Sequence, residues 1–129
     1  MAKVLGLGGV FFKSPDPEEL AKWYQQWLGM DLGYPYGISF KTEKMPENSY
    51  HVWSPFKHDT KYFEPSNNNY MFNLIVDNLD QILTKIKPSG CEIMEETERG
   101  DYGDFAWFID PDGNKVELWQ PPLKAPAEL

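Results

Sequence analysis

Two six-residue segments of this chain share one pattern, and the repeat constrains the fold more than any other feature. Residues 50–55 read YHVWSP, and residues 116–121 read VELWQP. After its first position, each segment has an ionisable residue, an aliphatic residue, Trp, a small or amide residue and Pro. His51 and Glu117 are therefore equivalent positions. Such a repeat predicts a domain built from two copies of one supersecondary unit.

The first half has one strand signal, one helix signal and three further strand signals. Residues 8–14 (GGVFFKS) are apolar and β-prone, and an amphipathic helical pattern then begins near Pro17 and ends at Gly29. Short strand candidates follow, separated by Gly, Pro and Asn. They lie at residues 30–34, 37–41 and 50–54. The first half is thus predicted to be a βαβββ unit.

The second half repeats this order. A strand is predicted at residues 70–76 and a helix at 79–87, which stops at Gly90. Three strand candidates follow, and a DPDGN turn at residues 110–114 joins the last two as a hairpin. They lie at residues 91–96, 105–109 and 115–119. The second half is predicted to be another βαβββ unit.

Chain length sets the domain organisation. The 129 residues amount to about one domain. We therefore expect a single domain over residues 1–129, with module one at about 5–55 and module two at about 70–122. The polar, irregular residues 56–69 are predicted to form a loop between the modules.

Composition excludes several classes of partner. The net charge is −8, from twenty acidic and twelve basic residues, and the basic residues do not cluster. We therefore expect neither nucleic acid nor an anionic membrane surface as a partner. Cys91 is the lone cysteine, and no apolar signal segment follows Met1, which favours a cytoplasmic location.

The segments VDNLDQIL and FAWFIDPDGNKVELWQP, together with the doubled βαβββ order, resemble the vicinal oxygen chelate superfamily. That superfamily includes glyoxalase I, bleomycin-resistance proteins and extradiol dioxygenases. The resemblance implies an α+β fold in which two tandem βαβββ modules form a curved, cup-shaped mixed sheet. It also implies a homodimer. Function does not follow from the fold, because this fold supports isomerases, oxygenases, transferases and binding proteins.

The same resemblance implies four metal-ligand positions, which map to Gly9, His51, Met71 and Glu117. Glycine has no ligating side chain, and a thioether is a poor ligand for the hard or borderline cations that the superfamily uses. Only His51 and Glu117 remain as weak metal candidates. We therefore expect no cofactor and no tightly bound divalent metal.

The remaining cup residues follow from strand alternation, since side chains two apart share a face. If Glu117 points into the cup, Trp119 does too, and the superfamily's pattern adds Phe105 and Trp107. The predicted ligand-binding residues are aromatic or polar; they are Phe11, Lys13, Trp53, Met71, Asn73, Phe105, Trp107 and Trp119. The opposite face, with Val10, Phe12, Phe72, Leu74 and Val76, is predicted to be core beneath the helices.

His51 and Glu117 are the candidate catalytic residues, and two roles stay open for them. They could pair with each other and hold the modules in register, or serve a bound ligand as base and hydrogen-bond partner. The function we predict is binding of a small organic molecule in an aromatic cup. The alternative is a metal-dependent lyase or isomerase, or a dioxygenase, of the same superfamily.

Overall fold

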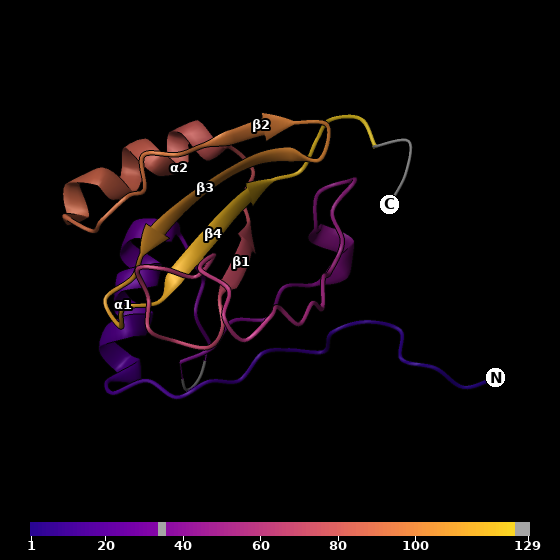
Figure 1. Ribbon diagram of the computed structural model, residues 1–129, viewed down its shortest axis with the longest axis horizontal. Helices are drawn as coiled ribbons and strands as arrows, with labels where there is room; N and C mark the ends of the chain where they lie inside the picture. Colours follow the sequence, from indigo (N-terminus) through magenta and orange to yellow (C-terminus); the bar gives the residue numbers. More distant parts are fainter. Residues whose placement is uncertain (34–35, 126–129) are drawn as a thin grey trace.

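The structure is a computed structural model that describes residues 1–33 and 36–125 (Figure 1). Its sheet has the strand order β1-β4-β3-β2. The strands are β1 (Phe72–Ile75), β2 (Glu98–Gly100), β3 (Gly103–Ile109) and β4 (Lys115–Gln120). β1 runs parallel to β4, and the other neighbours are antiparallel. The α-helices are α1 (Pro17–Leu28) and α2 (Leu79–Ile86), and 3₁₀ turns lie at η1 (Thr42–Lys44) and η2 (Lys87–Ser89).

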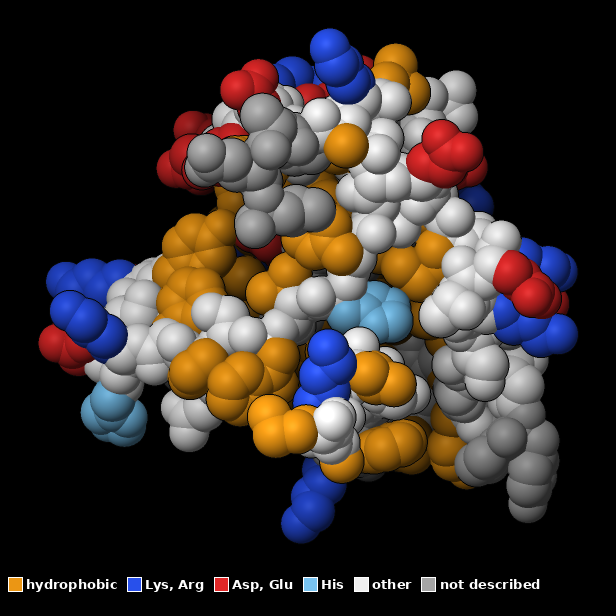
Figure 2. All heavy atoms as spheres, turned by 90° about the vertical axis from the view of Figure 1, so that its right-hand side faces the viewer, with side chains coloured by type: hydrophobic (Ala, Val, Ile, Leu, Met, Phe, Trp, Pro, Cys, Tyr) orange, Lys and Arg blue, Asp and Glu red, His pale blue; other side chains and the backbone are white. Residues whose placement is uncertain are grey.

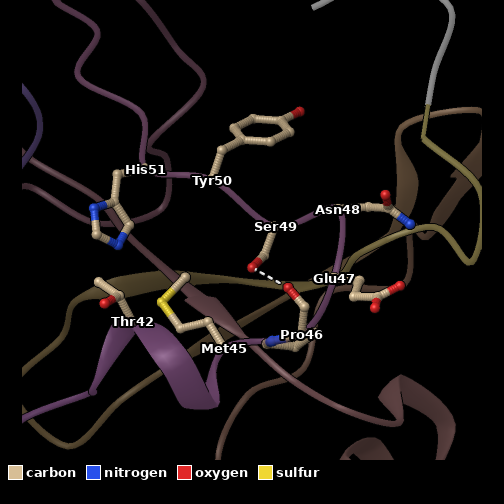
Figure 3. A pocket seen from close by; sticks show the side chains of 8 residues that line it. All are labelled: Thr42, Met45, Pro46, Glu47, Asn48, Ser49, Tyr50 and His51. Atoms are coloured by element: carbon tan, nitrogen blue, oxygen red, sulfur yellow. Dashed lines mark hydrogen bonds between the residues drawn. The ribbon is translucent and has the colours of Figure 1, made fainter.

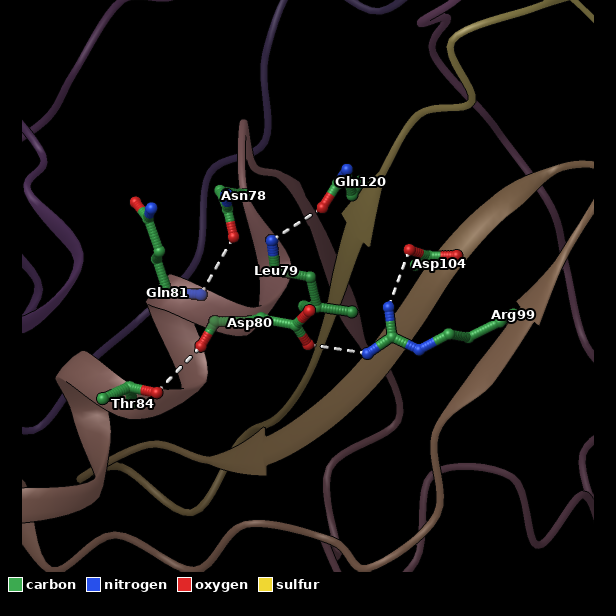
Figure 4. Close-up of polar contacts among 8 residues, drawn as sticks. All are labelled: Asn78, Leu79, Asp80, Gln81, Thr84, Arg99, Asp104 and Gln120. Atoms are coloured by element: carbon green, nitrogen blue, oxygen red, sulfur yellow. Dashed lines mark hydrogen bonds and ion pairs between the residues drawn. The ribbon is translucent and has the colours of Figure 1, made fainter.

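The predicted mixed α+β fold is confirmed, and its second half has the predicted βαβββ order, β1-α2-β2-β3-β4. The start of α2 is fixed by two side chains: Asn78 accepts a hydrogen bond from the Gln81 amide, and Gln120 of β4 accepts one from the Leu79 amide (Figure 4). Arg99 of β2 bridges Asp80 of α2 and Asp104 of β3. All three side chains are partly exposed, so the bridge orients β2 more than it stabilises the fold.

The helix predicted in the first half is also confirmed. Asp16 caps α1 by accepting a hydrogen bond from the Glu19 amide, and Pro17 occupies the first turn, where its missing N–H costs nothing. Gly29 ends the helix in the left-handed region at φ 67°. None of the helices in the described part of the chain has the length and apolar character that a membrane span requires.

The prediction of strands in the first half is wrong. Among the described residues of 8–14, 30–34, 37–41 and 50–54, no regular strand forms; residues 34–35 lie outside the described residues. A strand is stabilised by a neighbouring ladder and by side chains packed across it. Glycines at 6, 8 and 9 supply no such side chains, and Val10 and Phe11 remain exposed. Among the described residues, these β-prone segments therefore do not pair into a strand ladder.

A smaller correction concerns residues 91–96, which form no regular strand although they run beside β3. Ile93 makes an isolated antiparallel bridge to Phe108. The Met94 amide donates to the Trp107 carbonyl, and the Ile109 amide donates to the Glu92 carbonyl. The regular strand starts later, at Glu98, because the ladder there continues unbroken to Gly100.

The core lies between the two helices and one face of the sheet. Leu20 and Tyr24 of α1 and Leu79 and Ile86 of α2 pack with buried residues of β3 and β4. The strand residues are Ala106, Phe108, Val116 and Leu118, with Leu74 and Val76 partly buried against them. Leu74 and Val76 are where the alternation predicted them. Val10 and Phe12 are not: both are exposed, and Phe12 contacts the edge residue Phe72, with ring centroids 4.7 Å apart.

Asp110, at the turn between β3 and β4, organises one end of this core. One carboxylate oxygen accepts from the backbone amides of Asp112 and Asn114, and the other accepts from the Tyr24 hydroxyl at 2.8 Å and the Asn114 side chain. Gly113 completes the turn at φ 79°. The predicted hairpin turn is confirmed, and Tyr24 ties it to α1.

We predict that Tyr24 makes the fold sensitive to alkaline pH. Burial, followed by the charge of Asp110 and the hydrogen bond to it, raises the pKa of the Tyr24 phenol. The unfolded chain ionises this phenol near its ordinary value of about 10, whereas the folded chain does not. The stabilising contribution is therefore complete below about pH 10 and is lost as the pH rises above it. Urea denaturation at a series of pH values measures this loss.

Tyr24→Phe removes the titrating group and one hydrogen bond to a charged acceptor. At neutral pH the free energy of unfolding should fall by about 1–3 kcal/mol, and the decline above pH 10 should become shallower. Tyr36→Phe is the matched control, because Tyr36 is exposed. An alkaline decline of equal slope in wild type and Tyr24→Phe would contradict the prediction.

Candidate functional site

The sheet face that points away from the helices carries a row of polar and aromatic side chains. The ladders pair Asn73 with Glu117 and Glu117 with Trp107, so these three side chains lie side by side across β1, β4 and β3. The next row pairs Ile75 with Trp119 and Trp119 with Phe105. We call this surface the site face. Strand alternation predicted that its members share one side of the sheet.

Glu117 is the polar centre of the site face. Oε1 accepts a hydrogen bond from the Asn73 side-chain amide at 2.7 Å. Oε2 accepts two, from the Trp107 indole nitrogen at 2.9 Å and from the Tyr62 hydroxyl at 2.6 Å. Three neutral donors on three separate segments thus converge on one carboxylate. This arrangement holds the carboxylate in a fixed orientation.

Tyr62 comes from the loop that the sequence predicted between the modules. Its ring meets the Trp107 ring edge to face, with centroids 6.2 Å apart. Lys115 donates to the Tyr62 carbonyl at 2.6 Å, and its ammonium lies 5.1 Å from the Tyr62 ring centroid and 5.7 Å from that of Trp107. Asn68 of the same loop donates to Asn114 in the β3–β4 turn. The loop is irregular, as predicted, but it is fastened to the site face.

The position of Tyr62 changes its acidity. Partial burial, then the hydrogen bond to Glu117 and the negative charges of Glu117 and Glu98, raise the pKa of the Tyr62 phenol. The hydroxyl therefore stays protonated and donates to the carboxylate throughout the neutral range. Sequence reasoning missed Tyr62; the available signal was an aromatic pair, Tyr62-Phe63, within an otherwise polar loop.

Trp119, in the second row of the site face, is almost completely buried. Trp119 is 3 % exposed, lies parallel to Phe105 and contacts Tyr50, with ring centroids 6.2 and 4.9 Å apart respectively. Its indole nitrogen donates to the Tyr102 carbonyl at 2.7 Å. Gly103 permits this close approach, because a Cβ there would clash with the Gln120 carbonyl and the Trp119 indole. Trp107 is similarly buried, at 5 % exposed.

The structure brings together the predicted residues of the second half and not those of the first. Asn73, Phe105, Trp107, Glu117 and Trp119 share the site face, and Met71, half-buried, directly precedes β1. In the first half, three predicted residues are exposed: Phe11 (94 %), Trp53 (78 %) and Lys13. Strand alternation predicted that these residues would lie on the same face, but the strands on which that prediction rested do not form.

His51 lies on an irregular segment and not on a strand of the sheet. It is exposed and lines a shallow hollow formed by the chain around η1 (Figure 3). That hollow is lined by Thr42, Met45, Pro46, Glu47, Asn48, Ser49, Tyr50 and His51. Among the described residues, no hydrogen bond or ion pair joins His51 to Glu117. We therefore correct the predicted pairing of His51 with Glu117. The strand that was expected to place His51 in the cup does not form.

The metal positions implied by the sequence resemblance do not fit a cation. Gly9 and Met71 lack suitable ligand atoms, and both oxygens of Glu117 already accept hydrogen bonds. Within residues 1–33 and 36–125, no group of three or more His, Cys, Asp or Glu side chains is arranged to hold a metal ion. The residues present thus disagree with the ligand set that the superfamily's metal enzymes would need.

The sequence matches the family model described as Glyoxalase/Bleomycin resistance protein/Dioxygenase superfamily over residues 7–118. The chain belongs to this superfamily. The match spans both halves, including the first, where the described residues form no strands. No curated protein matches the sequence significantly.

Solved structures support the superfamily fold. An integron cassette protein from the mobile metagenome of V. cholerae is 19% identical with a TM-score of 0.58, covering 93% of this chain and 98% of that one. A superfamily member from Sphaerobacter thermophilus is 19% identical with a TM-score of 0.50, over the same shares of both chains. TnmS3, an antibiotic-binding protein from Streptomyces sp. CB03234, is 21% identical with a TM-score of 0.51, covering 84% and 89%.

We predict that Glu117→Gln lowers the pKa of Tyr62 toward its ordinary value, because the variant removes the charge that opposes the phenolate. The near-ultraviolet absorbance of phenolate during an alkaline titration measures this shift. Subtracting the titration of Tyr62→Phe isolates the Tyr62 signal. Glu96→Gln, an exposed site with the same loss of charge, should leave the midpoint unchanged. An unchanged midpoint in Glu117→Gln would show that the hydrogen bond does not exist in solution.

Proposed function

We propose that this member of the superfamily binds a small, partly aromatic organic molecule on the site face, without a tightly bound metal. The observation that carries the proposal is the Glu117 carboxylate, oriented by Asn73, Trp107 and Tyr62 among aromatic rings. A small-molecule site typically has this composition, with few, well-oriented polar groups on an apolar surface. The likeness to the antibiotic-binding protein TnmS3 agrees with this function but identifies no ligand.

The proposal favours binding over metal-dependent chemistry because the donor set is unsuitable. A lyase, isomerase or dioxygenase of this superfamily would need a divalent cation near Glu117, and of the other three implied positions only His51 has a side chain suited to such a cation. His51 lies in the hollow beside η1. A catalytic zinc typically keeps three protein ligands, and a non-haem iron keeps two histidines and a carboxylate. Among the residues that the structure describes, no group of three or more His, Cys, Asp or Glu side chains matches either set.

A neutral aromatic probe, naphthylethanol, tests the proposed function. We expect its titration to shift the indole N–H resonances of Trp107 and Trp119, which both belong to the site face. Trp23 and Trp27, on α1 beside the core, should not shift. Trp→Phe variants at these four positions assign the resonances. Protein treated with a chelator should bind as tightly as untreated protein, because no metal takes part.

Two outcomes would contradict the proposed function. Shifts confined to Trp23 and Trp27, or no shift at any indole, would show that the site face does not bind such molecules. Binding that is lost on chelation and restored by a stoichiometric divalent metal would instead support the metal-dependent alternative.

We further propose that the chain forms a homodimer through its N-terminal segment. This segment exposes a run of apolar side chains, Val4, Leu5, Leu7, Val10, Phe11 and Phe12. Figure 2 shows that hydrophobic side chains gather over a broad central part of the face on the side of the N-terminus. β1, beside which Phe12 lies, is an edge strand of the sheet in the described part of the chain, and an edge strand can pair with a further strand. A second copy would cover both features.

A variant that carries both Val10→Ser and Phe11→Ser tests the proposed dimer. Replacing these two exposed apolar side chains removes area that the second copy would bury, so the dimer dissociation constant should rise at least about tenfold. Light scattering during size-exclusion chromatography over a concentration series measures this constant. Leu123→Ser, an exposed apolar side chain outside the segment, is the control. A wild-type chain that stays monomeric at all concentrations would contradict the proposal.

A further inference from the structure

We propose that Glu117 recognises a protonated amine carried by a flat aromatic ligand, and that the Tyr62 hydroxyl occupies the amine's place in the free protein. This inference rests on the proposed function and names the chemical class of its ligand. It rests on three observations. They are the charge balance at Glu117, the aromatic surface around it, and the position of its hydrogen-bond donors, two of which lie on strands and one in a loop.

The charge of Glu117 is not balanced by a cation. Its three hydrogen-bond donors, an amide, an indole and a phenol, are all neutral. In the described part of the chain, no lysine, arginine or histidine lies within ion-pair distance of Glu117. The three present hydrogen bonds have one charged partner, whereas an ammonium group would add the attraction of an opposite charge to its hydrogen bond, so an ammonium ligand gains most here. The net charge of −8 also attracts cations from solution.

The rings around Glu117 suit a cation as well as a flat ligand. The Lys115 ammonium already lies over the Tyr62 and Trp107 rings, at 5.1 and 5.7 Å from their centroids. Aromatic faces attract positive charge and stack on planar groups. Lys115 forms no ion pair with Glu117, and its ammonium donates to the Tyr62 carbonyl. The site face therefore combines an unbalanced negative charge with aromatic rings.

Of the three donors, Tyr62 is the one that a ligand can displace. Asn73 and Trp107 lie on β1 and β3, where ladder hydrogen bonds fix them beside Glu117. Tyr62 lies in an irregular loop and is 38 % exposed. Moving the Tyr62 side chain breaks one hydrogen bond to Glu117 and one aromatic contact with Trp107. A ligand with an ammonium group and a ring would replace both contacts.

Three probes of one shape but different charge test the inference: naphthylethylamine, naphthylethanol and naphthylacetate. Isothermal titration calorimetry on the full chain at neutral pH gives their affinities, and the Trp107 indole resonance reports where they bind. We expect the amine to bind at least about tenfold more tightly than the alcohol, and the acetate to bind most weakly. The alcohol serves as the neutral reference.

Two variants test the roles of the residues. Glu117→Gln keeps the shape of the side chain and removes its charge, so the preference for the amine over the alcohol should fall to about threefold or less. Glu96→Gln loses the same charge at an exposed site and should keep the full preference. Tyr62→Phe removes the competing hydroxyl, so the amine should bind roughly threefold to tenfold more tightly than to wild type.

The outcomes separate this inference from the proposed function. If the three probes bind the site face with equal affinity, or if the alcohol binds better than the amine, the inference is wrong and the proposed function stands. An amine preference that Glu117→Gln leaves intact would also overturn it. If none of the probes shifts the Trp107 resonance, both the inference and the proposed function fail.

Discussion

The site depends on the hydrogen bonds that Asp110 accepts at the β3–β4 turn. Its carboxylate holds the turn amides, the Asn114 side chain and the Tyr24 hydroxyl. The turn fixes the antiparallel register, which places Trp107 opposite Glu117. Asn114, held by Asp110, in turn accepts a hydrogen bond from Asn68 in the Tyr62 loop. One buried carboxylate thus links α1, the hairpin and the loop that covers the site.

Strand alternation divides the hairpin between stability and binding. Ala106, Phe108, Val116 and Leu118 face the helices and are fully buried. The residues between them, including Trp107 and Glu117, face the other way. Because the period is two, a shift of one residue in register would exchange the two sets and bury Glu117 under the helices. The Asp110 turn therefore determines both the core and the orientation of the site.

The sequence predicts the second half well because its signals are local. The DPDGN turn, the alternation on β3 and β4 and the helical period of α2 act within a few residues. The first half shows the limit of the repeat argument. Similar residues at 50–55 and 116–121 predicted similar strands, but a strand also needs a neighbour. Val116 and Leu118 have β1 and β3 on either side, whereas residues 50–55 have no ladder in the structure.

The candidate site was predictable only in part, for the same reason. Glu117, Trp107 and Asn73 follow from alternation along strands. Tyr62 does not, because no period relates a loop residue to a carboxylate that lies 55 positions along the chain. The contact exists because Lys115 and Asn114 hold the loop against the hairpin.

The hydrogen bonds at Glu117 also bear on the metal positions that the superfamily resemblance implies. A carboxylate that ligates a cation must direct a lone pair at it, and here Oε1 faces Asn73 while Oε2 faces Tyr62 and Trp107. All three partners donate hydrogen bonds to the carboxylate in this arrangement. An environment of donors stabilises negative charge through hydrogen bonding, and the group that best replaces a donor is a stronger donor. This hydrogen-bonding environment is the physical basis of the ammonium ligand that we propose at Glu117.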